Sequence, residues 1–496
     1  MTHLLISPIL VPMAFAVITW CFRHHDRHSG SAAIAGALIH LACAGWLLSA
    51  VMADGVVVLW VGSWPSPAGI CLAADLLSAV LVTVTSVLHV AVMIYARADT
   101  TREQIRAGFH PFMQMLTAAI CGAFLTGDLF NLYVWFEVML MASFGIMVMD
   151  HPAARLPNAV KYVTLNIVAT LFLLTGIGLV YGLTGTLNLA DLHDKIALIE
   201  NDGLLAGTSL LLMTAFGIKS ALFPLFFWLP AAYHTLPPGV AAFFGGLLTK
   251  VGVYALIRLF TLVFVTQPYI THTILMIAAG LTMLSGVLTA ASRMDIRRIL
   301  SFHIISQVGY MALGLAVFTP LALAAAFIYM VHNIMAKAAL FLVGGLIRRA
   351  AGSFHLTRIG SLYKTHGLLS AGFFIPAFAL AGFPPLSGFW AKLLIIYACL
   401  ETRHFGAAAL AAFVGLLTLF SMVKIWMEAF WKPSPQTQDV SEIRTLSPWM
   451  MGPVLGLCLM LVVMGLFIEP VFHLALTAGE QLMDPAGYVA AVKGGK

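Results

Sequence analysis

The sequence predicts an all-α polytopic membrane protein with about fourteen transmembrane helices. Of its 496 residues, 61% are hydrophobic and only 9% are charged, whereas about a quarter of the residues in a soluble domain are charged. The apolar residues gather in runs of about twenty, and a helix of that length crosses a hydrocarbon core about 30 Å thick. Two of these runs combine a lysine with a nearby proline, which is typical of a helix interrupted at a transport site.

Fourteen apolar runs are expected to cross the membrane. The first has no basic segment before it and no small-residue cleavage site after it, so we expect a retained helix rather than a signal peptide. Residues 54–72 end in a Pro/Gly turn after alternating apolar residues, which predicts a small hairpin. The acidic loop 184–203 predicts a short surface helix. The expected spans are 4–22, 31–53, 73–96, 111–127, 129–149, 162–183, 204–232, 238–262, 270–291, 299–318, 321–347, 367–399, 404–431 and 450–470.

The basic residues predict the orientation of the chain. Sixteen of the 26 Lys and Arg residues fall in one alternate set of loops, while the opposite loops hold little more than Lys195 and Arg403. The positive-inside rule therefore places the arginine-rich loops in the cytoplasm and both termini outside. Because the net charge of +6 is spread over short loops, we expect no nucleic-acid partner. The sixteen residues are Arg23, Arg27, Arg97, Arg102, Arg106, Arg155, Lys161, Arg293, Arg297, Arg298, Arg348, Arg349, Arg358, Lys364, Lys432 and Arg444.

The stretch from Ala215 to Gly252 holds two lysines near the middle of spans seven and eight. An ammonium group at that depth costs several kcal/mol unless it faces a partner or a wet cavity. Pro224 follows Lys219 by five residues, so we expect the helix to break beside this lysine. Freed backbone is tolerated in a membrane only where protein or water surrounds it. Lys219 and Lys250 are therefore candidates for an ion or proton path; the alternative is that both side chains extend to the membrane surface.

Span twelve contains the second expected break. Pro384 and Pro385 cannot sit in an unbroken helix, and Lys392 follows seven residues after Pro385. Spans seven and twelve lie five spans apart, an odd separation that inverts the direction of crossing. This spacing predicts two five-helix repeats of inverted topology, with the pathway between and through them. The expected units are residues 1–110 (helices 1–3), 111–266 (helices 4–8), 267–431 (helices 9–13) and 432–496 (helix 14 and tail).

Glu137 is the carboxylate nearest the middle of a span. A buried carboxylate is expensive unless it is paired, and Lys219 is the most suitable cationic partner. The alternative interpretation is a purely structural ion pair. Asp128 lies at the edge of its span and is expected to be solvated, and Asp75 is a weaker candidate at another edge.

Span eleven carries Lys337 well inside the membrane, with Asn333 one turn before it on the same face. His332 titrates near neutral pH in its free form and is a candidate relay group, although a buried histidine is more often structural. His303 in span ten lies four residues from Gln307, where a water-wire lining and interhelical hydrogen bonding are both plausible roles.

The chemistry open to these residues is proton transfer. The sequence has no nucleotide-binding motif and no metal-ligand spacing, and its six cysteines are scattered through apolar runs, so we expect no cofactor and no metal. Burial favours a neutral lysine and a nearby carboxylate favours a charged one, so a lysine between these influences can gain and lose a proton. Because the candidates lie on different helices at similar depth, they predict a lateral path. Its order is Glu137, Lys219, Lys250, Lys337 and Lys392.

The same residues carry a resemblance to the proton-conducting antiporter modules shared by multisubunit Na+/H+ (Mrp-type) antiporters and respiratory complex I. The likeness is strongest over residues 70–430, and the chain most resembles the D-subunit branch of that family. The resemblance implies fourteen helices with inverted repeats, and a proton path through the glutamate of span five and the lysines of spans seven, eight and twelve. The stretches that carry it are FNLYVWFEVMLMASF, AFGIKSALFPLFFWLPAAYHTLPPGVAAFFGGLLTKVGVYALIR, DIRRILSFHIISQVGYM, HNIMAKAALFLVGG and LAGFPPLSGFWAKL.

The resemblance also implies partners and a location. It predicts a transporter subunit rather than an enzyme, in a bacterial cell membrane, working with other subunits of a hetero-oligomeric antiporter on protons and a monovalent cation, Na+ first. One alternative is a proton-pumping subunit of a quinone-linked NADH dehydrogenase or membrane hydrogenase, although only a short tail is expected after residue 470. Another is a scaffold subunit, which would have no need of mid-membrane charges. Hard cations require several oxygen ligands, which leaves open a cation path in another subunit.

Overall fold

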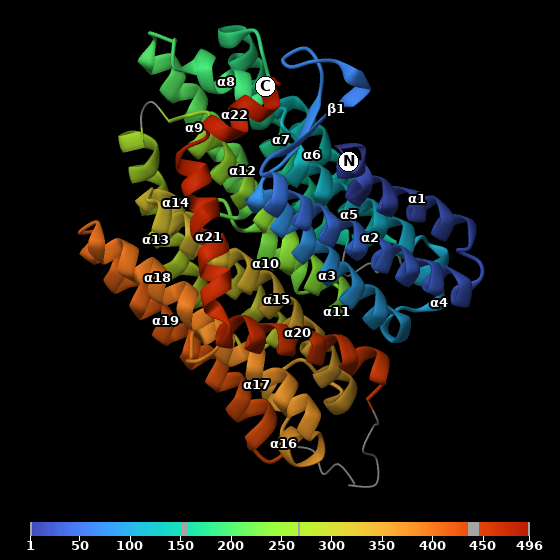
Figure 1. Ribbon diagram of the computed structural model, residues 1–496. Helices are drawn as coiled ribbons and strands as arrows, with labels where there is room; N and C mark the ends of the chain where they lie inside the picture. The colour runs from blue at the N-terminus through green and yellow to red at the C-terminus, as the bar shows by residue number, and fades with distance from the viewer. Residues whose placement is uncertain (1, 150–155, 266–267, 435–445, 495–496) are drawn as a thin grey trace.

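The computed structural model describes residues 2–149, 156–265, 268–434 and 446–494, and Figure 1 shows them as a bundle of helices with one small hairpin. The basic-loop residues Arg155 and Arg444 lie outside the described residues. The N-terminal region holds the 3-10 helix η1 (Thr2–Ile6), α1 (Ser7–Cys21), α2 (Asp26–Asp54), β1 (Val57–Trp60), η2 (Val61–Ser63), β2 (Cys71–Ala74), α3 (Leu76–Asp99) and α4 (Arg102–Arg106).

The middle of the chain forms two successive groups of helices. The first comprises α5 (Phe109–Leu125), α6 (Leu129–Val148), α7 (Leu156–Thr184), α8 (Leu189–Ile196), α9 (Asp202–Ser220), α10 (Trp228–Tyr233), α11 (Pro238–Phe243), the π-helical turn η3 (Phe244–Leu248) and α12 (Thr249–Leu262). The second comprises α13 (Pro268–Ser292), α14 (Ile296–Val317), α15 (Pro320–Ala351), η4 (Leu356–Arg358), α16 (Leu362–Thr365), α17 (Gly367–Ala381), α18 (Ser387–Glu401), α19 (Phe405–Trp426) and η5 (Met427–Trp431).

Twelve helices in the described chain are long and apolar enough to cross a membrane. Two further predicted spans correspond to shorter helices, namely α5 and the pair α17 and α18. The expected hairpin and surface helix are confirmed as β1–β2, which pair antiparallel, and as α8. The inverted relation of the two repeats stays a prediction.

Both predicted helix breaks are present. Helix α9 ends at Ser220, one residue after Lys219, and α10 begins only at Trp228. Helix α17 ends at Ala381, where Gly382 adopts a left-handed conformation (φ 89°), and α18 begins at Ser387. The prolines explain both interruptions because they lack a backbone donor and clash with the preceding turn.

The C-terminal region differs from the prediction. The last span was expected over 450–470 with a short tail, but α20 (Pro448–Leu466) is followed directly by α21 (Ile468–Met483) and α22 (Ala486–Lys493). Trp390 of α18 donates to the carbonyl of Gly465 (3.0 Å), so α20 ends beside the second break. Helix α21 then packs against α15. Glu469 and Pro470 ended the apolar run in the sequence, although the chain continues as helix.

The innermost helices carry the candidate residues. The most apolar 18-residue stretch is 100% buried in Pro238–Leu262 and 94% buried in both α14 and α15. The corresponding stretch of α2 is only 33% buried. The inner helices hold Lys250, His303, His332 and Lys337. These four candidates therefore lie in the centre of the bundle, on its most buried helices.

The two ends of the described chain lie on the same face of the bundle. Helix α22 packs against α8 and β1, and η1 also packs against β1. The indole of Trp60 donates to the carbonyl of Val492 (3.1 Å), which fastens α22 over this surface. We call the other end of the bundle the basic face; it carries Arg97, Arg293, Arg348 and Lys432.

A buried ion pair joins three elements near the termini. Oδ2 of Asp75, which caps α3, lies 2.7 Å from a guanidinium nitrogen of Arg258 on α12. The ring of Tyr488 in α22 covers that guanidinium at 5.1 Å. Burial by itself would raise the pKa of Asp75, but the charge and hydrogen bonds of Arg258 hold the pKa below its usual value. The pair therefore stabilises the packing of α3, α12 and α22.

Replacing Asp75 with asparagine should lower the free energy of unfolding by about 3–5 kcal/mol, because Arg258 would remain buried without its partner. The pair between the exposed Arg102 and the half-buried Asp26 (3.2 Å) offers a control that is open to solvent, and Asp26→Asn should cost less than about 1 kcal/mol. Thermal unfolding of the purified full-length chain in detergent compares the two variants. Equal losses would contradict a special role for the buried pair.

The same pair should make stability sensitive to acid. Because folding lowers the pKa of Asp75, its contribution is present above the unfolded-state pKa and is lost as the pH falls through the folded-state value. The stability difference between the wild type and Asp75→Asn should therefore shrink as the pH is lowered into that window. A difference that stays constant with pH would show that the charge of Asp75 is not the cause.

Candidate functional site

The first part of the site joins α6, α7 and α9. The hydroxyl of Thr170 donates to Oε1 of Glu137 (2.6 Å), and Nζ of Lys219 donates to the same hydroxyl (3.3 Å). Lys219 is only 5% exposed, and its ammonium lies 5.4 Å from the ring centroid of Phe136. Glu137 and Lys219 are thus neighbours as predicted, but Thr170 connects them and no direct ion pair forms between these two described residues.

The second part is an irregular turn that holds Lys250. The five residues of η3 adopt a π-helical conformation between α11 and α12, and such turns are frequent at functional sites. Nζ of the fully buried Lys250 donates to the carbonyl of Gly245 in this turn (2.8 Å). Gly252 packs against the backbone at Lys219 and Ser220, where an added Cβ would approach Ser220 N to 2.7 Å. This close approach seats α12 directly against the first helix break.

Lys337 lies on α15 across from that turn. Its Nζ is 3.5 Å from the carbonyl of Leu300 on α14, and the side chain is fully buried. The glycines of η3 pack against α15 on both sides of this lysine, Gly246 near Ile334 and Gly245 near Phe341. The turn that holds Lys250 and the helix that holds Lys337 are therefore in direct contact.

The second helix break holds Lys392. Its Nζ donates to the carbonyls of Leu380 and Ala381 (2.9 and 3.0 Å), which are among the last carbonyls of α17 and have no continuing helix to bond them. The ammonium also lies 5.3 Å from the ring centroid of Tyr310. The lysine thus satisfies the backbone groups that the Pro384–Pro385 interruption exposes.

His332 connects α15 with the start of α18. Its Nδ1 lies 2.9 Å from the hydroxyl of Ser387, the first residue of α18. The next residue, Gly388, packs closely against its neighbours. A Cβ added to it would lie 2.7 Å from Nε2 of His332 and 1.9 Å from the carbonyl oxygen of Ala379. Only glycine fits there, so the histidine and the break are held together by close backbone packing.

Several buried polar atoms near this break have no protein hydrogen-bond partner among the described residues. Both ring nitrogens of His303 and both amide atoms of Asn333 are in this group, together with Nε2 of His332 and Nε2 of Gln307. Buried polar groups are normally satisfied by protein or by ordered water. Their concentration between α14 and α15 is typical of a polar interior that water can enter.

The five predicted path residues therefore follow one continuous series of packed elements. The order is α6, α7, α9, α12 with η3, α15 and α18, and consecutive elements in it are in contact. Among the described residues, none of the four lysines has a carboxylate within 4 Å, and each one donates to a hydroxyl or carbonyl oxygen. The site is a row of ammonium groups held by neutral oxygen atoms.

The structure corrects three minor expectations. Lys424 and Glu428 lie four residues apart in span thirteen, a spacing that predicted an interfacial pair. Glu428 instead binds Lys432 (2.6 Å), while Lys424 donates to the carbonyls of Ala291 and Arg293 (both 2.7 Å). Asp128 is half-buried rather than solvated, because it caps α6 by accepting from Asn131 N (2.8 Å). Asp75 belongs to the ion pair with Arg258 rather than to the row of lysines.

Three contributors were not predicted from the sequence. Thr170 is a mid-span hydroxyl that resembles any helix-interior threonine. The Gly245 carbonyl becomes available through the π-helical turn, whose only signal was the pair of adjacent glycines. Ser387 stood inside the motif LAGFPPLSGFWAKL and could have been identified as the first polar residue after the double proline.

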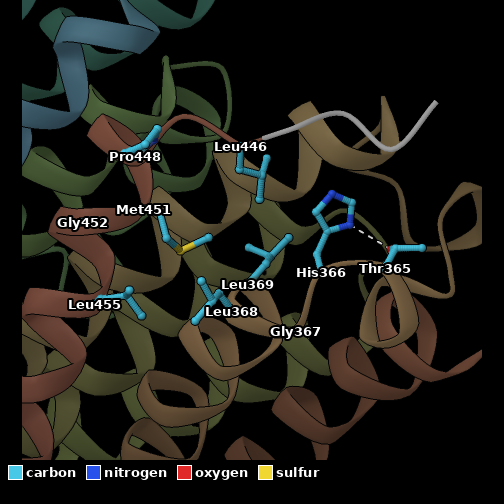
Figure 2. Close-up of a pocket in the computed structure, with 10 residues that line it drawn as sticks. All are labelled: Thr365, His366, Gly367, Leu368, Leu369, Leu446, Pro448, Met451, Gly452 and Leu455. Atoms are coloured by element: carbon cyan, nitrogen blue, oxygen red, sulfur yellow. Dashed lines mark hydrogen bonds between the residues drawn. The ribbon is translucent and has the colours of Figure 1, made fainter. Parts of the chain in front are cut away.

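A surface pocket of about 610 Å³ lies away from this row, between the starts of α17 and α20 (Figure 2). Its lining is apolar apart from Thr365 and His366, whose hydroxyl and Nδ1 are 2.8 Å apart. None of the path residues lines it, so the largely apolar pocket is separate from the charged interior.

Comparison with known proteins identifies the family of this chain. Residues 126–421 match the family described as "NADH:quinone oxidoreductase/Mrp antiporter, TM". The chain is 42% identical over 496 residues to the D subunit of the Na(+)/H(+) antiporter of Alkalihalophilus pseudofirmus, covering 99% of each chain. It is 35% identical to the D subunit of the Na(+)/H(+) antiporter of Bacillus subtilis, again over 99% of each.

Solved structures show the same fold. A chain of the Mrp complex from a Dietzia species superposes with a TM-score of 0.92 at 32% identity, with 99% of each chain covered. A chain of respiratory complex I from Thermus thermophilus superposes with a TM-score of 0.82 at 22% identity, covering 97% of this chain and 99% of that one. The region matched by the family contains Glu137 and all four lysines. The chain belongs to the NADH:quinone oxidoreductase/Mrp antiporter family.

Proposed function

We propose that this chain is the proton-translocating D-type subunit of a multisubunit Na+/H+ antiporter. The observation that carries the proposal is the row of buried lysines, each held by neutral oxygen atoms rather than by a carboxylate. An amine in such a position can release and regain a proton without breaking an ion pair. The relatives named as antiporter D subunits, similar over 99% of their length, favour this function over that of a quinone-linked pump.

The proposed path runs laterally from Glu137 through Lys219, Lys250 and Lys337 to Lys392. The two helix breaks and the π-helical turn supply oxygen partners along it, and His332 and His303 line its second half. Thr170 makes the link between the acid and the first lysine sensitive to small movements of α7. If the carboxylate moves away from Lys219, the ammonium loses its nearest anion and its proton is released along the row.

The setting of this path completes the proposal. The chain works with the other subunits of the antiporter complex in a bacterial cell membrane, as a transporter subunit rather than an enzyme. The basic face lies in the cytoplasm and both termini lie outside. Helices 4–8 and 9–13 form the two inverted repeats, each with one broken helix. Few carboxylates lie within the membrane-spanning helices that the structure describes, which leaves open a Na+ path in another subunit.

Thr170→Val should lower cation/proton exchange about tenfold, because it removes both hydrogen bonds between Glu137 and Lys219 while keeping the side-chain shape. Thr175→Val on the exposed side of the same helix is the matched control, since its hydroxyl bonds only the carbonyl of Leu171 (2.8 Å). Exchange is measured in vesicles that contain the full complex. Equal rates in the two variants would remove Thr170 from the mechanism.

Alanine in place of Glu137 or Lys219 should abolish exchange, with a loss of at least about a hundredfold, while the complex still assembles. Each change removes a proton-carrying group at the start of the path. Subunit recovery after purification is the control for assembly. Transport close to the wild-type rate in either variant would contradict the proposed coupling of these two residues.

Arginine should not replace lysine at positions 250 and 392. Arginine retains the positive charge but does not release a proton in proteins. We therefore expect Lys250→Arg and Lys392→Arg to transport nearly as poorly as the corresponding alanine variants. Wild-type exchange in both arginine variants would show that the lysines act as fixed charges, and the relay would be wrong.

A further inference from the structure

A charged pocket on the basic face remains outside the proposed path. It has a volume of about 840 Å³ and lies between the end of α10, the junction of α13 and α14, and the end of α15. Its lining residues are His234, Thr235, Ser292, Arg293, Met294, Asp295, Arg297, Arg298, Arg348 and His355. Four guanidinium groups and a single carboxylate therefore surround one cavity.

The one carboxylate is already occupied. Asp295 caps α14 by accepting from the backbone of Arg297 and Arg298 (2.9 and 3.3 Å), and its Oδ2 pairs with the Arg297 side chain (3.0 Å). Arg293, Arg298 and Arg348 form no ion pair within the described residues. Three cationic side chains of the pocket are thus available to an anion from outside this chain.

The walls of the pocket are fixed by backbone contacts. Ile296 N donates to the carbonyl of Phe354 (3.1 Å), and Leu356 N donates to the carbonyl of Met294 (2.8 Å). The ring of Phe354 lies 4.1 Å from the Arg297 guanidinium and 5.3 Å from that of Arg348. Arg297 and Arg348 are therefore held by a braced turn and an aromatic ring, so little ordering of these two side chains is needed to bind a ligand.

The pKa of His234, which also lines the pocket, is lowered by burial and by the arginines. Burial lowers the pKa of His234, and the charges of Arg298 and Arg297 lower it further. Its Nδ1 already contacts the carbonyl of Pro230 (2.7 Å). With four arginines and one aspartate in its lining, the pocket carries more positive than negative charge.

We propose that this pocket is a binding site for a phosphate-bearing anion, and that its occupant is the headgroup of an acidic phospholipid. Guanidinium groups match phosphate oxygens in geometry and charge. The orientation in the proposed function places this pocket on the cytoplasmic side, where basic pockets between transmembrane helices are typical lipid-headgroup sites.

An apolar track leads to the pocket and favours a lipid over free phosphate. Ile277, Leu281 and Leu288 of α13 are 59%, 41% and 49% exposed. Their spacing of four and seven residues places them on one helix face, which ends at Ser292 in the pocket wall. An acyl chain lying along this face would place its phosphate among the arginines.

Retention of lipid by the purified full-length chain tests the site. Native mass spectrometry after exchange into phosphatidylglycerol or phosphatidylcholine should show retained phosphatidylglycerol only. The double variant Arg293→Gln/Arg298→Gln should weaken this retention by about tenfold or more. The matched control is Arg27→Gln/Arg106→Gln, which removes the same charge from exposed positions outside the pocket and should retain lipid normally.

Inorganic phosphate is the second probe. One outcome is that Arg293→Gln/Arg298→Gln weakens phosphate binding and leaves phosphatidylglycerol retention unchanged. In that case the occupant is free phosphate and the lipid assignment is overturned. If neither probe distinguishes the pocket variant from the control, the anion site itself is overturned. Binding is measured without transport, so either result leaves the proposed proton path untouched.

Discussion

The structure depends on one constraint, which is that an ammonium group inside a lipid-surrounded bundle must have oxygen atoms within reach. For two of the four lysines, the chain meets this need at interruptions of the regular helix. Lys392 bonds the last carbonyls of α17 and Lys250 bonds a carbonyl of the π-helical turn. At the second break the lysine and the interruption stabilise one another, since Lys392 satisfies carbonyls that would otherwise be buried without a donor.

Features governed by local chemistry could be predicted from the sequence. The composition predicted the membrane setting, and Pro224, Pro384 and Pro385 predicted both breaks, because proline acts on its own turn whatever surrounds it. Mid-span charges identified Glu137 and the four lysines, since their cost in hydrocarbon is independent of the fold. The family resemblance identified the same residues, and the structure places them on elements that touch in the expected order.

Features that arise from packing between distant helices could not be predicted. Thr170 links Glu137 and Lys219 only because α7 passes between α6 and α9. The π-helical turn depends on Gly245 and Gly246 packing against α15. Helices α21 and α22 were not predicted, since Glu469 and Pro470 interrupt the apolar pattern at the point where α21 begins.

The packing of α20 beside the second helix break has a consequence for the synthesis and insertion of the chain. Synthesis proceeds from the N-terminus, so α17 and α18 enter the bilayer well before α20 reaches Trp390. Until then, the backbone from Pro385 to Ser387 lacks the cover that Gly465 gives it in the finished fold. The region around Lys392 is therefore completed late in synthesis, when α20 packs against α18.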